Sequence, residues 1–129
     1  MVKNFLDFLG RIFISSIFIF SGINKILNFD SSTQWMEMYG VPGILLYPTI
    51  LIEIIFSILI IVGYKTKFAA FLLFLFCLMT ASIFHSDFSN QIQLIAFLKN
   101  IGLAGGLLFL IVNGTKGWAF ENKKKYVRL

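Results

Sequence analysis

The stretch YPTILIEIIFSILIIVGYKTK, residues 47–67, decides the class of fold to which this chain belongs. It is long and apolar enough to cross a hydrocarbon core as a helix, and it closes on a glycine and a turn that carries two lysines. Glu53 stands near its middle, where insertion of an acidic residue costs roughly 2.5–3.5 kcal/mol. A carboxylate at that depth requires a compensating group elsewhere in the chain.

The composition places the whole chain in a membrane. Of its 129 residues, 58% are apolar and 13% are charged, whereas a soluble domain carries about 25% charged residues. Much of the net charge of +5 lies in the tail ENKKKYVRL, which is typical of a segment that orients a membrane protein and contacts anionic lipid. We therefore expect the lipid bilayer, and no nucleic acid, as a partner.

The single cysteine, Cys77, and the single histidine, His85, limit the chemistry that one chain can perform. An intramolecular disulfide, an iron–sulfur cluster, bis-histidine haem ligation and a tetrahedral zinc site all need more of these ligands. We expect no metal site, and an electron carrier must be a diffusible ligand or lie on a partner.

The apolar runs predict an all-α fold, an integral membrane four-helix bundle. The spans are expected at about residues 5–27, 44–63, 68–85 and 92–112. The segment between the first two predicts a short interfacial helix, with Ser31 or Ser32 as its cap. Residues 1–117 are then a single membrane domain and residues 118–129 a basic tail. Because the lysines outside the spans fall on one side, both termini are predicted to be cytoplasmic.

Ionisable residues of all four spans fall in the outer half of the predicted bundle. Glu53, Lys99 and Asn100 lie within spans, whereas Lys25 and His85 lie at outer span ends. Lys99 is the expected partner of Glu53 by depth, and Lys25 or Arg11 are the next candidates. The candidates for proton transfer are Glu53, His85 and Lys99, and the candidates for ligand binding are Lys25, Glu53, His85, Lys99 and Asn100. The competing interpretation is that Lys25 extends to the lipid headgroups and that His85 is an ordinary interfacial residue.

Helical spacing predicts which faces point into the bundle. Polar and small residues share one face in three of the spans: Arg11, Ser15, Gly22 and Lys25; Thr49, Glu53 and Ser57; Lys99, Gly102, Gly106 and Asn113. Gly102 and Gly106 form a GxxxG pair, which favours close helix packing. We expect structural roles for Arg11, Gly22, Gly102 and Gly106.

Five segments of the sequence, taken in their order along the chain, resemble the DoxX family of small bacterial membrane proteins. The matching pieces span about residues 8–117: GRIFISSIFIFSGINKI, YGVPG, LIEIIFSILIIVGYKTKFAA, IFH and FLKNIGLAGGLLFL. The resemblance implies a four-helix protein of the bacterial inner membrane. It also implies relatives that serve as subunits of quinone-linked or thiol-linked redox complexes.

Three functions are compatible with these features. The first is a redox-associated subunit that binds quinone in the outer half of the bundle, which would make the chain part of a quinone-linked oxidoreductase. The second is a small proton-linked transporter, which would need a homo-oligomer to form a path. The third is an assembly subunit whose buried charges contact another membrane protein.

Overall fold

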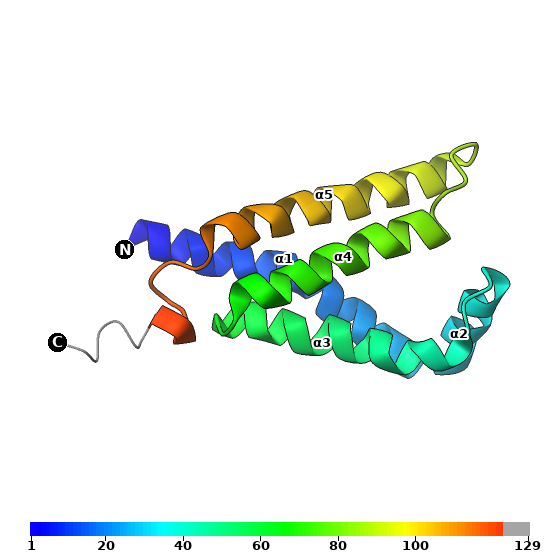
Figure 1. Ribbon diagram of the computed structural model, residues 1–129, viewed down its shortest axis with the longest axis horizontal. Coiled ribbons are helices and arrows are strands. Elements are labelled where there is room, and N and C mark those ends of the chain that lie inside the picture. Colours follow the sequence, from blue (N-terminus) through cyan, green and yellow to red (C-terminus); the bar gives the residue numbers. More distant parts are fainter. Residues whose placement is uncertain (123–129) are drawn as a thin grey trace.

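Four long helices form a bundle in the computed structural model, which describes residues 1–122 (Figure 1). Their bounds are α1 Val2–Leu27, α3 Leu46–Val62, α4 Thr66–Phe84 and α5 Gln91–Asn113. The short helix α2, Phe29–Met38, follows α1, and the single turns η1, Gly43–Leu45, and η2, Phe120–Asn122, precede α3 and follow α5. The predicted all-α four-helix bundle is confirmed, and each long helix is apolar and long enough to cross a membrane.

The helices pack in two pairs. Helix α1 lies along α3, α4 lies along α5, and contacts between α3 and α4 join the pairs, whereas α1 and α5 touch at few positions. Figure 1 shows the N-terminus and the chain after α5 at one end of the bundle and α2 at the opposite end. We call these the terminal end and the α2 end.

Local sequence explains where the helices stop and start. Gly63 ends α3 with φ at 75°, a left-handed conformation that glycine adopts without strain, and its N–H donates to the Leu59 carbonyl at 2.9 Å. Asn90 is the N-cap of α5. Its side-chain oxygen accepts a hydrogen bond from the N–H of Ile92 at 3.0 Å, which stabilises the start of the helix. The expected cap of α2 at Ser31 or Ser32 is wrong, since that helix already begins after Asn28.

Two apolar clusters hold the bundle together. The larger one occupies the half nearer the terminal end and includes the buried side chains of Phe18, Ile60, Leu73 and Leu107. The smaller one joins α2 to the bundle through Met36, Leu46, Ile50 and Phe84. Helix α2 therefore packs over one end of the bundle, and the larger apolar cluster lies toward the other end.

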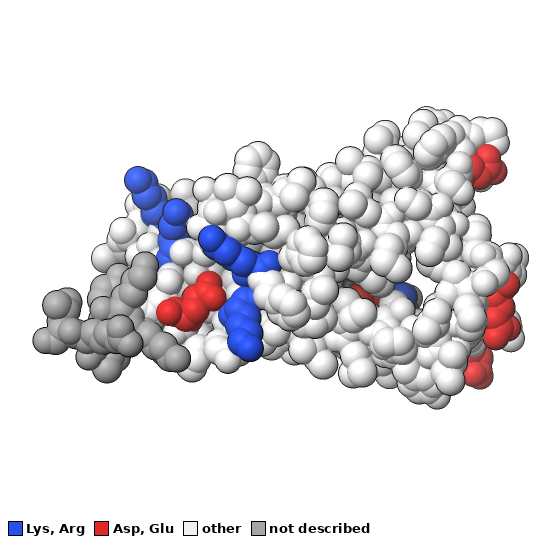
Figure 2. Space-filling view, viewed as in Figure 1, with Lys and Arg blue, Asp and Glu red and all other residues white. Residues whose placement is uncertain are grey.

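The charges separate between the two ends, as the sequence predicts. Figure 2 shows most lysine and arginine side chains toward the terminal end and a group of acidic side chains at the α2 end. The acidic residues at the α2 end and its loops are Asp30, Glu37 and Asp87. Cytoplasmic termini remain a prediction from this asymmetry, and the lysine run 123–125 lies outside the described residues.

Residues 114–122 pack across the terminal end. Trp118 packs edge-on against Phe5 and Phe8, with ring centroids 6.2 and 6.1 Å apart. The N–H of Glu121 donates to the Gly63 carbonyl at 2.9 Å, which ties this segment to the end of α3. The first residues of the predicted tail therefore lie against the bundle, and the domain boundary at residue 117 stays a prediction.

Candidate functional site

The buried carboxylate of Glu53 is paired with Lys25. The Nζ atom of Lys25 lies 2.7 Å from Oε1 of Glu53, and the two side chains are 25% and 1% exposed. Lys25 also donates to the hydroxyl of Ser21 at 2.6 Å. The predicted pairing of Glu53 with Lys99 is therefore wrong, and Lys25, the next candidate, takes its place.

Close packing of α1 against α3 makes this pair possible. A Cβ atom on Gly22 would lie 2.6 Å from Cγ1 of Ile54, so only glycine lets the helices approach this closely without a shift. Lys25 follows Gly22 by about one helical turn and reaches across to Glu53. The packing role of Gly22 stays a prediction, and this close approach is the contact that a substitution would test.

The pair leaves hydrogen-bonding capacity unused. Oε1 of Glu53 lies within ion-pair distance of Lys25, yet it receives no well-aligned hydrogen bond from the described residues. Ser57, which shares a helical face with Glu53, donates its hydroxyl to the backbone carbonyl of Glu53 and not to the carboxylate. The carboxylate of Glu53 has the chemistry to accept a further hydrogen bond from a ligand hydroxyl.

Lys99 lies on the surface of α5. The residues that α5 buries are Ala104 and Leu107, and Lys99 is about 140° around the helix from Ala104. Helical side chains tilt toward the helix N-terminus, so Lys99 extends toward the α2 end, where a lysine can reach the headgroup region. Its exposed position does not add a charge to the bundle interior.

The predicted inward face of α5 is wrong for the same reason. Gly102 and Asn113 are exposed, and a Cβ on Gly102 would meet no atom of the described residues within 4 Å. Gly106 alone faces another helix, because a Cβ there would lie 2.9 Å from Cδ1 of Ile14 on α1. The GxxxG pair therefore does not act as a unit within this chain.

The ion pair lines a cavity of about 260 Å³ in the half of the bundle nearer the α2 end, which we call the ion-pair cavity. All four long helices and α2 contribute to its wall. Figure 2 shows a blue and a red side chain inside a hollow between the two charged ends of the molecule. The polar side chains of the lining are Ser21, Lys25, Thr49, Glu53, Thr80, His85 and Asn100.

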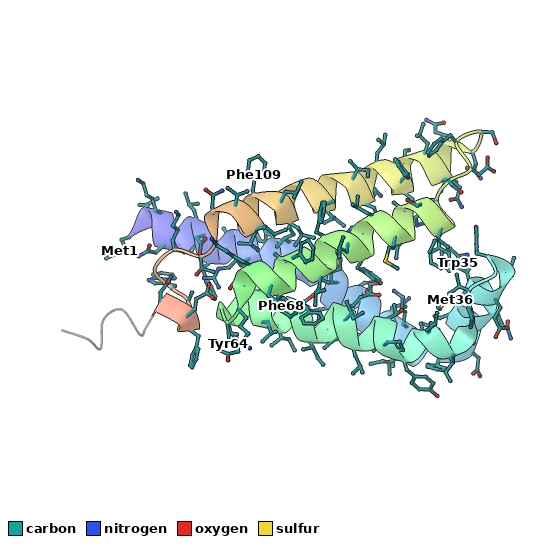
Figure 3. All side chains as sticks on the ribbon, viewed as in Figure 1. Met1, Trp35, Met36, Tyr64, Phe68 and Phe109 are labelled. Carbon is teal, nitrogen blue, oxygen red and sulfur yellow. The ribbon has the colours of Figure 1, made fainter. Side chains whose placement is uncertain are left out.

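Aromatic rings complete the wall. Trp35 stacks on Phe84 with ring centroids 4.5 Å apart, and both line the cavity with Phe76. Figure 3 shows Trp35 and Met36 on α2, beside the end of α4. The sequence alone does not place Trp35 in a site, because nothing in the pattern shows that α2 folds back over the bundle.

His85 ends α4 at the rim of this cavity. Its Nδ1 lies 3.1 Å from Oε1 of Gln93 on α5, and its ring centroid is 6.3 Å from that of Trp35. Gln93 was not predicted, since a single glutamine in the first turn of a span has no distinctive signal. The structure thus gathers four of the five candidate ligand-binding residues, Lys25, Glu53, His85 and Asn100, and leaves Lys99 outside the cavity lining.

Arg11 lies near the terminal end of the bundle, outside the ion-pair cavity, and donates hydrogen bonds there. Its Nη1 donates to the carbonyls of Ile60 and Ile61 at 3.1 and 2.6 Å, its Nη2 donates to the carbonyl of Trp118, and its Nε pairs with Asp7 at 3.0 Å. These carbonyls include the unpaired last groups of α3. Arg11 therefore joins α1, the end of α3 and the segment after α5, and its structural role stays a prediction.

Four apolar helices, each long enough to span a membrane, define a multi-pass membrane protein, and a buried ion pair lines a cavity between them. Within residues 1–122, no three His, Cys, Asp or Glu side chains are grouped as metal ligands.

The chain belongs to the DoxX family, whose family model matches residues 6–86. It is 35% identical over 118 residues to inner membrane protein YqjF of Escherichia coli (strain K12), which covers 89% of this chain and 91% of that protein. It is 34% identical over 113 residues to inner membrane protein YphA of the same organism, covering 82% and 81%. No solved structure matches. Both relatives are inner membrane proteins by name, which agrees with the predicted location.

Proposed function

We propose that this DoxX-family protein binds the ring of a quinone in the ion-pair cavity, as a subunit associated with a membrane redox complex. The observation that carries the proposal is the Lys25–Glu53 pair, which places a donor and an acceptor 2.7 Å apart in the wall of an otherwise largely apolar, aromatic cavity. A quinone needs both partners, because its oxygens accept hydrogen bonds when oxidised and donate them when reduced.

The polar and the aromatic lining residues would contact different parts of the quinone. The ammonium group of Lys25 donates to a ring oxygen of the oxidised ligand, and the carboxylate of Glu53 accepts from the hydroxyl of the reduced ligand. Trp35 and Phe84 offer flat apolar faces to the ring. The amide of Asn100 lies in the same wall and supplies a further polar contact.

Protons would enter and leave at the α2 end. His85 lies at the rim, and histidine is the side chain suited to proton exchange near neutral pH. The apolar cluster around Phe18 and Leu107 lies toward the terminal half of the bundle, and residues 114–122 pack across that end. This arrangement favours a binding site with proton exchange on one side over a transport path through the chain.

Electrons would come from or pass to a partner protein. The chain has one cysteine and one histidine, which are too few for bis-histidine haem ligation or for an iron–sulfur cluster within one chain. The redox partner is therefore part of the proposal, and the ligand carries the electrons within this subunit.

Trp35 provides a direct test, because it lines the cavity. In a Trp118→Phe background it is the remaining tryptophan, and titration with a decyl benzoquinone should quench its fluorescence saturably. The double variant Lys25→Met/Glu53→Gln should fold and lose saturable quenching. The matched control Lys99→Met, which removes a lysine outside the cavity, should keep it.

Two results would overturn the proposal. The first is wild-type protein that shows only linear, collisional quenching and contains no co-extracted quinone. The second is a Lys99→Met variant that loses binding as completely as the double variant.

A further inference from the structure

A second, apolar space borders the ion-pair cavity. A groove of about 380 Å³ lies between α3 and α4 in the same half of the bundle, and we call it the α3–α4 groove. Its lining is apolar apart from Thr49 and Thr80, whose hydroxyls donate to the carbonyls of Leu45 and Phe76 at 2.8 and 2.9 Å. Neither hydroxyl hydrogen is free, so the groove suits hydrocarbon.

The groove reaches the surface that faces lipid. Leu75 and Met79 line it and are 39% and 60% exposed. Since this helix face lies within a membrane span, the groove opens into the hydrocarbon layer.

A single layer of side chains separates the two spaces. Five residues line both the ion-pair cavity and the α3–α4 groove: Met36, Thr49, Phe76, Thr80 and Phe84. Three of them, Phe76, Thr80 and Phe84, follow one another at i, i+4 and i+8 on α4 and form one ridge. Opposite that ridge stand Thr49, a small side chain, and Met36, an unbranched one that adapts its shape readily.

We propose that the ligand carries a long hydrocarbon chain, which leaves the ion-pair cavity between Thr49 and Thr80 and lies in the α3–α4 groove. This inference rests on the proposed function and names the ligand class, a lipid whose polar ring bears an aliphatic or isoprenoid chain. The cavity of about 260 Å³ lies below the range of roughly 300–1,000 Å³ usual for complete ligand sites. The groove supplies the missing volume where the ligand becomes apolar.

Among the described residues, the cavity on the other side of the bundle is separate from the ion-pair cavity. A cavity of about 340 Å³ lies between α1 and α5 near the terminal end, and its lining includes Asp7, Arg11 and Lys116. It shares no lining residue with the ion-pair cavity. A hydrocarbon chain placed here would remove water from these charged groups and offer them no polar contact in return, which is unfavourable.

The test compares one ring with and without a chain. Isotopically labelled dimethoxy-methyl-benzoquinone and its decyl derivative are titrated against purified full-length protein, with both corrected for partition into the detergent micelle. Leu75→Trp fills the groove without touching the ion-pair cavity, and Ile55→Trp is the control at an exposed α3 position outside both linings. Leu75→Trp should weaken binding of the decyl compound about tenfold and leave the bare ring unchanged, because the added bulk meets only the chain.

Photochemical labelling then locates the chain. A decyl compound with a diazirine at the chain end should label α3 and α4 near Ile52 and Leu72, and excess bare ring should suppress that labelling. Labelling of α1 or α5 would overturn the route. Labelling of the groove that the bare ring does not suppress would show an ordinary bilayer lipid chain and would also overturn it.

The outcomes separate the two proposals. If the bare ring binds and Leu75→Trp weakens neither compound, the chain inference fails and the proposed function stands. If neither compound binds wild-type protein, both fail.

Discussion

Removing Lys25 should harm the protein more than removing its partner. Lys25→Met strands the carboxylate of Glu53, which is 1% exposed, whereas Glu53→Gln strands a lysine that is 25% exposed and lies at the end of its span. A lysine there can turn toward the headgroups, and a buried carboxylate has no such alternative. The two halves of one ion pair therefore have unequal effects on stability.

The distance sets the scale of the effect. Two unit charges 2.7 Å apart attract by about 6 kcal/mol at an effective dielectric constant of about 20, before the cost of desolvation is subtracted. Removing one partner of a buried pair typically costs about 3–5 kcal/mol, which we expect for Lys25→Met. For Glu53→Gln we expect about 1–3 kcal/mol, the usual cost of an unsatisfied polar group.

The double variant distinguishes the cost of an unpaired charge from the cost of altered packing. Lys25→Met/Glu53→Gln leaves no unpaired charge in the pair, so it should be more stable than Lys25→Met alone. Thermal unfolding of the four proteins would be compared in one detergent, with Lys99→Met as the control for loss of an exposed lysine, where a change within about 0.5 kcal/mol is expected. The reasoning is refuted if Glu53→Gln is the more damaging single change, or if Lys99→Met is as damaging as Lys25→Met.

Three further predictions concern the ends of the bundle and its packing. In a cysteine-free background, a cysteine at Ser89 should react with an impermeant thiol reagent on intact cells and one at Lys65 should not; the reverse would invert the orientation. Arg11→Met should lower the free energy of unfolding by about 2–4 kcal/mol, because it leaves backbone carbonyls without donors, and increased proteolysis after α5 would report release of the C-terminal segment. Gly22→Ala should destabilise by about 1–3 kcal/mol through its clash with α3, whereas Gly10→Ala, which meets nothing within 4 Å, should be neutral or stabilising; equal melting temperatures would contradict the close helix approach.

The sequence by itself determined the four spans, the presence of a short helix between the first two, and the difference in charge between the two ends. Each apolar run matches the thickness of a hydrocarbon core, and its hydrogen bonds are internal to the helix, so its existence requires no partner. The buried face of α1 was also predictable, because Arg11, Ser15 and Gly22 share one face with no other polar face competing. The same spacing placed Glu53 and Ser57 inside the bundle.

Only the tertiary structure decided which groups meet at the site. Depth along the membrane favoured Lys99 over Lys25 as the partner of Glu53, and this prediction failed because the partner depends on how α5 is rotated against α4. Rotation is not encoded in the apolar pattern, because lipid chains and helix interiors are both apolar and a span can turn Ala104 or Ile101 inward at similar cost. The contribution of Trp35 to the cavity likewise depends on the fold-back of α2, a contact between segments far apart in the chain that no local periodicity specifies.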